Sequence, residues 1–429
     1  MKSKNTQLSK PKKSFRRIMR RIALFFSVFG PATITAMADN DAAGVATYSL
    51  AGAKLGYPIL FLLLIVTVFL AITQEMGMRL TLITRKGLAD LIREKFGVRI
   101  SIFVFISLFI ANMGTIIVDM SAIKTTSSML NLPVVPSLMF LLVLIFLFVS
   151  KGNYKLTQNI MLFSCLFYLA YIFSAFKANP NWGMAVSNLI YPHGVNPTPE
   201  YLRNYLIIGM GVLGTTITPW GQFFLSSFAY DKKIEAKNVR YSQAETYWGA
   251  FLTDFFSFFM IVATAATLFV HKIDLISGEQ AAMAIQPFAG DLAGTFFALG
   301  ILNAGFMGIV VISLCTAYAF SEFFGLSGSL DYSLQQSKTF YIIFISQLLI
   351  AAIVIAFPAV SLFKLAIAAQ TLNAMTLPLV FYYLIKLTSD RNLMKQNVNT
   401  RFQRNFSIIA TIIIAIASIL TLIFVFFRL

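Results

Sequence analysis

Long apolar stretches alternate with short polar connections along the whole chain. Each stretch has about 20 residues or more, which is enough to cross the ~30 Å hydrocarbon core of a bilayer as a helix. The pattern therefore predicts an all-α polytopic membrane protein with about eleven transmembrane helices. Their expected ranges are 22–50, 57–83, 101–130, 132–150, 158–177, 203–229, 247–271, 292–322, 339–357, 359–386 and 406–428.

Two of these spans, 22–50 and 203–229, are interrupted in the middle by polar, helix-breaking residues. The first break contains Asp39 and Asp41, and the second contains Thr218. At membrane depth, unpaired backbone groups and carboxylates are tolerated only where they line a cavity enclosed by protein or filled with water. Two broken helices in corresponding halves of a chain are typical of a transport site, so helices 1 and 6 are predicted to carry it.

The position of the breaks also predicts the topology. Five spans precede the longest hydrophilic connection and five follow it, so the second set enters the membrane from the opposite side. We expect a five-plus-five inverted repeat with one additional, peripheral helix. The predicted division is 1–21 as a basic cytoplasmic tail, 22–177 as the first repeat, 178–202 as an extracellular loop, 203–386 as the second repeat, and 387–429 as a loop with the last helix.

Composition agrees with a membrane protein and fixes its expected orientation. Of the 429 residues, 58% are hydrophobic and only 12% are charged, while the formal net charge is +17. Most lysines and arginines lie in connections on the side of the amino terminus, which predicts a cytoplasmic amino terminus. Because they are spread over several loops, they do not indicate a nucleic-acid partner. We expect a multi-pass protein of a prokaryotic plasma membrane that contacts the lipid bilayer, acts as a monomer and needs no cofactor.

The first break supplies two carboxylates for a possible ion site. Asp39 and Asp41 are two residues apart, so on a continuous helix they would point in different directions. A break between them allows both to approach one cavity. Either carboxylate could instead cap the following half-helix, which is expected to begin near Ala42, and of the two Asp39 is the expected cap. Capping by one leaves the other free to bind a cation.

The second break offers further oxygen ligands. They are the hydroxyl of Thr218, the amide of Gln222 and the carbonyls around Thr215, where Pro219 removes an amide donor. Oxygen ligands without sulfur or imidazole favour Mg²⁺, Ca²⁺ or Mn²⁺ over Zn²⁺ and copper. The Thr218 hydroxyl has an alternative role, which is a hydrogen bond to its own helical turn.

Two further carboxylates lie inside predicted spans. Asp119 and Asp254 have no partner nearby in sequence, so both are candidates for a gate or a proton path. Asp39 and Trp220, at the two breaks, are further candidates for this role. Glu75 and Arg79 are four residues apart and are expected to form a structural ion pair instead.

Seven segments, which extend over nearly the whole chain, carry a family resemblance: 30–41, 51–57, 74–79, 84–89, 214–226, 370–378 and 393–394. They resemble the natural resistance-associated macrophage protein (NRAMP) family of divalent-metal transporters. The resemblance implies a LeuT-type fold, alternating access, and Asp41 as the acidic metal ligand. It also implies that Ala38, Gly44 and Gln370 belong to the metal site.

The chain departs from the family pattern at the metal site itself. Ala42, Ala43 and Gly44 stand where the family has proline, glycine and a metal-binding asparagine. Thr218 replaces the metal-binding methionine and Trp220 replaces a histidine. The missing sulfur and the smaller side chains resemble the NRAMP-related magnesium transporter branch and imply a wider pocket for a partly hydrated ion. We therefore expect Mg²⁺ uptake, with Mn²⁺ as a second substrate, and no proton coupling.

Three alternatives remain open from the sequence. The first is a proton-coupled carrier of Mn²⁺ or of a broader set of metals, including Al³⁺. The second is a LeuT-type, sodium-coupled symporter of a small organic solute, although two neighbouring aspartates disfavour an anionic substrate. The third is a membrane-embedded enzyme. It is disfavoured because the two histidines, His193 and His271, both fall in predicted outer loops.

Overall fold

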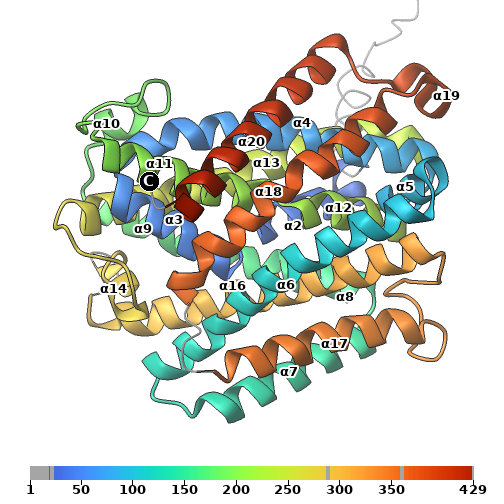
Figure 1. Ribbon diagram of the computed structural model, residues 1–429. Coiled ribbons are helices and arrows are strands. Elements are labelled where there is room, and N and C mark those ends of the chain that lie inside the picture. Colours follow the sequence, from blue (N-terminus) through green and yellow to red (C-terminus); the bar gives the residue numbers. More distant parts are fainter. Residues whose placement is uncertain (1–18, 20–23, 287–289, 358–361, 428–429) are drawn as a thin grey trace, which may run out of the picture.

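The structure is a computed structural model that describes Met19 and residues 24–286, 290–357 and 362–427 (Figure 1). These residues form helices and their connections, with no β-strand among them. The predicted basic tail, 1–21, falls outside the described residues except for Met19.

The helices of the first half of the chain are α2 (Pro31–Ala38), α3 (Ala42–Leu55), α4 (Leu60–Thr84), α5 (Leu88–Phe96), α6 (Val98–Met129), α7 (Val134–Lys151), α8 (Tyr154–Ser164) and α9 (Leu169–Lys177). Those of the second half are α10 (Trp182–Ser187), α11 (Pro199–Thr216), α12 (Pro219–Asp231), α13 (Val239–Thr264), α14 (Gly278–Ala282), α16 (Ala293–Phe324), α17 (Lys338–Ile355), α18 (Leu362–Thr388), α19 (Arg391–Met394) and α20 (Arg401–Phe427).

The predicted spans agree with these helices. Within the described residues, 9 helices are long and apolar enough to cross a membrane. The first and sixth predicted spans are not among them, because each is divided into two shorter helices: α2 and α3 in the first, α11 and α12 in the sixth. The division into broken and continuous helices is therefore the one that the polar breaks predict.

The four half-helices lie at the centre of the bundle. They pack against α4, α6, α13, α16 and α18, while α7 and α17 lie at one edge (Figure 1). The last helix, α20, packs on α18 at the periphery and exposes large apolar side chains such as Ile409 and Ile413. Phe140 on α7 and Ile353 on α17 are similarly exposed. Apolar side chains on the outside of a bundle indicate contact with lipid rather than water.

The second break has a simple backbone cause. Pro219 is the first residue of α12 and has no amide hydrogen, so it cannot continue the hydrogen-bonding pattern of α11. Ile217 and Thr218 adopt extended conformations between the two helices. The carbonyl of Thr215, four residues before the proline, is consequently left without its helical donor.

Small residues allow the central helices to approach closely. At Gly214 on α11, an added Cβ would lie 1.8 Å from the backbone oxygen of Gln370 and 2.8 Å from the nitrogen of Ala374, both on α18. Small residues are the usual means by which membrane helices reach such contact distances. Gly214 therefore fixes the separation of the second broken span from α18.

We expect Gly214→Ala to force these two backbones apart and to destabilise the protein by about 2 kcal/mol or more, as overpacking does. The control is Gly300→Ala on α16, where an added Cβ has no atom within 4 Å among the described residues. Thermal unfolding in detergent should show a lower midpoint for Gly214→Ala and an unchanged or higher midpoint for Gly300→Ala. Equal midpoints for the two variants would contradict the close-packing argument.

Candidate transport site

Asp39 connects the two breaks. Its side chain is 1% exposed, and its Oδ1 accepts a hydrogen bond of 3.0 Å from the Thr218 hydroxyl. Its backbone oxygen accepts a second hydrogen bond, of 3.2 Å, from the Thr215 hydroxyl. The other carboxylate oxygen, Oδ2, is buried and has no hydrogen-bond partner among the described residues. Asp39 thus offers one free carboxyl oxygen where the two broken helices meet.

Asp41 caps the second half of the first broken helix. Its Oδ1 accepts a hydrogen bond of 2.6 Å from the backbone nitrogen of Gly44, at the start of α3. Asp119 on α6 accepts from the next amide, that of Ala43, at 3.0 Å. Two carboxylates from different helices therefore share one helix amino terminus, where free amides and the helix dipole stabilise negative charge.

Gly308 on α16 makes room for this pair. A Cβ at Gly308 would lie 2.1 Å from Oδ2 of Asp119 and 2.6 Å from Cβ of Asp41. The sequence favoured Asp39 over Asp41 as the cap of this half-helix, whereas in the structure the cap is Asp41. Capping uses one of its two carboxylate oxygens, so Asp41 can still act as a ligand through the other.

Thr218 has two hydrogen bonds, and neither is the bond to its own preceding turn that the sequence also allowed. Its hydroxyl accepts from the backbone nitrogen of Gly221 at 3.1 Å, which caps α12, and it donates to Asp39. The Ala38 carbonyl, another predicted ligand, accepts from the backbone nitrogen of Asp41 at 3.0 Å. Carbonyl oxygens have two lone pairs, so this bond leaves one for a cation.

The predicted amide ligands are buried but are differently engaged. Gln222 on α12 is 0% exposed, and both its amide oxygen and its amide nitrogen lack a partner among the described residues. It lies beside α4 at Gly77. Gln370 on α18 accepts a hydrogen bond of 2.6 Å from Asn373, while its own amide nitrogen is unpartnered in the described part of the chain. Buried amides without partners mark places where water or an ion would be stabilised.

Trp220, which the resemblance places where the family has a histidine, lies on α12 directly after Pro219. It is 0% exposed, its indole nitrogen has no partner among the described residues, and its backbone oxygen accepts from the Cys315 thiol. An indole cannot take up or release a proton near neutral pH, so this side chain is not a proton carrier.

The geometry corrects one expectation, that a small residue at position 44 widens the pocket. A Cβ at Gly44 would lie 2.3 Å from the backbone oxygen of Asp39 and 2.8 Å from the Thr215 hydroxyl. The space that a larger side chain would need is therefore occupied by the first break itself, and Gly44 contributes close packing rather than volume.

Asp254 on α13 is a further buried carboxylate near the first break. It is 4% exposed, and neither carboxylate oxygen has a partner in the described part of the chain. The neighbouring residues of α13, Thr253 and Ser257, bind the side chain of Asn40 in the first break. Asp254 therefore remains a candidate for a gate or proton path, on the α13 side of the break.

Glu245, which is fully buried and bonded to the start of α2, is not among the residues predicted from the sequence. The predicted span began at residue 247, so Glu245 was placed in the preceding loop, whereas α13 begins at Val239. An acidic residue two positions before a predicted span, where the other charges are mainly basic, was the available signal. The expected ion pair of Glu75 and Arg79 is present, with 2.7 Å between the carboxylate and guanidinium atoms.

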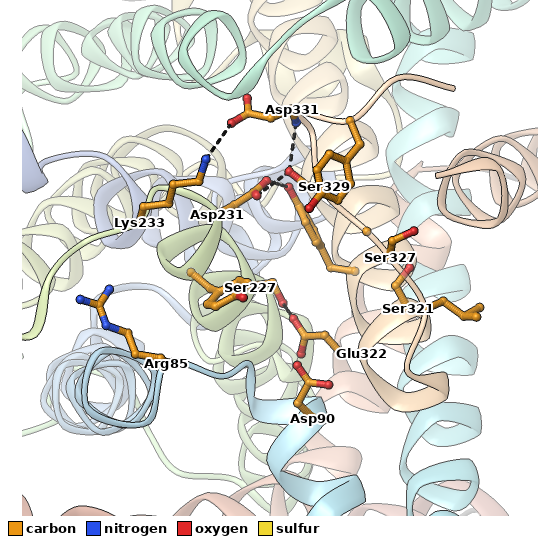
Figure 2. A pocket seen from close by; sticks show the side chains of 15 residues that line it. Arg85, Asp90, Ser227, Asp231, Lys233, Ser321, Glu322, Ser327, Ser329 and Asp331 are labelled. Atoms are coloured by element: carbon orange, nitrogen blue, oxygen red, sulfur yellow. Dashed lines mark hydrogen bonds and ion pairs between the residues drawn. The ribbon is translucent and has the colours of Figure 1, made fainter. Parts of the chain in front are cut away.

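A separate polar cavity of about 380 Å³ lies between α5, α12, α16 and the connection that follows α16 (Figure 2). Glu322 accepts from the Ser227 hydroxyl there and faces Asp90, whose pKa is raised by burial. Asp231 accepts from Ser329 and from Tyr318, so it holds the α16–α17 connection onto α12. None of the residues of either break lines this cavity, so we place the candidate site at the breaks.

Comparison with known proteins establishes the family. The model of the natural resistance-associated macrophage protein-like family matches residues 32–424. The chain belongs to this family. Among its NRAMP relatives, a divalent metal cation transporter MntH of Levilactobacillus brevis is 22% identical over 91% of this chain and 86% of its own length. Another MntH, of Yersinia pestis, is 27% identical over 70% of this chain and 73% of its own length.

Solved structures agree on the fold. A manganese transporter of Eremococcus coleocola superposes on this NRAMP chain with a TM-score of 0.76 at 18% identity, covering 93% of this chain and 86% of the other. The nucleobase-cation symporter Mhp1 superposes with a TM-score of 0.56 at 13% identity, covering 92% and 90%. The predicted LeuT-type fold with helices 1 and 6 broken is thereby confirmed.

Removing the Thr218 hydroxyl should damage both helix capping and the contact between the breaks. We expect Thr218→Val to lower stability by about 1 kcal/mol or more, because α12 loses its cap and Asp39 loses its donor. Thr218→Ser keeps the hydroxyl and should behave like the parent. Thermal unfolding in detergent measures both variants. A parent-like midpoint for Thr218→Val would argue against the capping role.

Proposed function

We propose that this chain transports divalent metal cations across the membrane by alternating access, with Mg²⁺ as the main substrate and Mn²⁺ as a second one. Family membership and the metal-transporting relatives support divalent cation transport. The similar solved transporter is described as a manganese transporter, so the comparisons do not point to Mg²⁺. The choice of Mg²⁺ is supported by the chemistry of the site alone.

The observation that carries the proposal is the set of oxygen atoms at the two breaks. Asp39 has a free carboxylate oxygen, Asp41 lies two residues away, and the Thr218 hydroxyl faces Asp39. Hard, small cations bind oxygen ligands, and Mg²⁺ typically combines one or two carboxylates with water molecules that it retains. The unpartnered amide of Gln222 could bind such water. The proposed ligand set contains no sulfur atom, which is the kind of ligand that favours a softer ion.

The membrane potential alone can drive the accumulation of a divalent cation, without coupling to protons. Two positive charges moving toward an inside-negative potential gain about 4.6 kcal/mol per 100 mV, from ~2.3 kcal/mol per elementary charge. Trp220 cannot exchange protons, which supports uncoupled transport. The runner-up is proton-coupled Mn²⁺ transport, and one observation favours it: Asp119 lies beside Asp41 at the amino end of α3. A carboxylate in that position could carry a proton.

Uptake by purified protein in liposomes tests the proposal. We expect Mg²⁺ and Mn²⁺ uptake that grows with an imposed inside-negative potassium diffusion potential, with no change in internal pH. Acidification of the interior during uptake would support the runner-up, and exclusion of Mg²⁺ would end the magnesium proposal.

In the same assay, Asp39→Ala and Asp41→Ala should each lower uptake to background, because each removes an anionic ligand from a buried cation site. The matched control is Asp274→Asn in an outer connection, where the exposed carboxylate pairs with Lys54. This control should transport like the parent. Near-normal uptake by both site variants would exclude the breaks as the transport site.

Thr218→Met tests selectivity. A thioether favours Cd²⁺ and disfavours strongly hydrated Mg²⁺, so the ratio of Cd²⁺ to Mg²⁺ uptake should rise by about tenfold or more. Thr218→Ser serves as the control and should keep the parent ratio. The Gly44→Asn change that the family pattern suggests is unsuitable as a partner substitution, because backbone fills that space. A ratio in Thr218→Met equal to the parent's would contradict the placement of residue 218 at the ion.

A further inference from the structure

Glu245 caps a helix to which it does not belong. It lies on α13 and is 0% exposed, and its Oε1 accepts hydrogen bonds of 2.9 Å from the backbone nitrogens of both Gly30 and Thr33. These amides are at the start of α2, which has no side-chain cap of its own. Gly30 has φ 141°, a conformation that favours glycine. The first half-helix therefore receives its missing acceptor from another helix.

Two more contacts hold the same end of α2. At Gly249, one turn after Glu245 on the same face of α13, an added Cβ would lie 3.1 Å from the backbone oxygen of Ala32. Lys232, just after α12, donates to the backbone oxygen of Phe29. The start of α2 is thus held from α13 on one side and from the end of α12 on the other.

The other end of α2 reaches the candidate site. The helix has only 8 residues, which corresponds to about 12 Å, and it ends at Ala38 next to Asp39. A helix this short moves as one body, so the contacts at its start also decide where the Ala38 carbonyl and Asp39 are placed. A buried carboxylate in a membrane helix is costly unless it is paired, and the two amides with the positive end of the α2 dipole supply that pairing.

We propose that Glu245 is a positioning residue that caps α2 from α13, holds this half-helix in its closed position and thereby places Ala38 and Asp39 at the transport site. Opening of the membrane side on which α2 begins then requires these two hydrogen bonds to break. The proposal concerns the closing of the site and does not depend on which cation is transported.

Cysteine accessibility on α2 tests this inference without any transported ion. The reporter is Thr35→Cys in a background with Cys165→Ser and Cys315→Ser. Thr35 is fully buried on α2 and faces Gly221 of α12, where a Cβ would lie 3.6 Å from its methyl group. A membrane-impermeant maleimide is added on the side where α2 begins, with no divalent cation present, and the labelling rate is measured.

We expect Glu245→Ala to raise the labelling rate of this reporter about tenfold, the effect of losing a cap of ordinary strength. Glu245→Gln keeps an acceptor oxygen and should label at a rate close to the parent's. The matched control is Thr246→Val, a buried change at the next residue, whose hydroxyl bonds only its own helix at Ser242. It should leave the rate unchanged.

An unchanged rate in Glu245→Ala would overturn the proposal. An equal acceleration in Thr246→Val would overturn it too, because it would show general loosening of α13. If Glu245→Ala is not recovered folded, Glu245→Met takes its place, because it keeps a side chain of similar length without an acceptor oxygen and should accelerate labelling in the same way. Because labelling needs no metal, failure here is distinguishable from failure of the proposed transport, which the uptake assay reports separately.

Discussion

The rest of this structure depends on the cost of leaving polar groups unpaired in a membrane. Breaking two helices at mid-span exposes amides and carbonyls, and the buried carboxylates nearby add charge. Many of these polar groups are satisfied by hydrogen bonds between the two breaks, or between a break and a neighbouring helix. Asp41 and Asp119 accept from the start of α3, Thr218 caps α12, and Asp39 accepts from Thr218. The buried oxygen atoms that remain unpaired, such as Oδ2 of Asp39, lie at the breaks where we propose that the cation binds.

Close packing determines which groups can meet there. Gly214, Gly44 and Gly308 each lie where a Cβ would overlap an atom of a neighbouring helix or of the opposite side of a break. With larger residues at these positions the helices would separate, and hydrogen bonds of about 3 Å between the breaks would be lost. The oxygen atoms at the breaks and the glycines around them are therefore parts of one arrangement.

Much of this arrangement is predictable from sequence, because hydrophobic length and helix-breaking residues are local signals. The broken spans, the central carboxylates and the Glu75–Arg79 pair follow from spacing alone. The assignment of the cap to Asp41 rather than Asp39 does not, since both are close enough in sequence to α3 and only the turn geometry decides. Glu245 was missed because its partners lie more than 200 residues away along the chain. Long-range contacts of this kind leave no periodic signal.

Gly308 links the packing of α16 to the charge at the start of α3. A Cβ at this position would lie 2.1 Å from Oδ2 of Asp119 and 2.6 Å from Cβ of Asp41, so even the smallest substitution would displace one of these side chains. Because both carboxylates accept backbone amides at the start of α3, such a displacement would disturb these hydrogen bonds. The electrostatics of the first break therefore depend on a residue with no charge and no polar side-chain atom, on a helix that neither break belongs to.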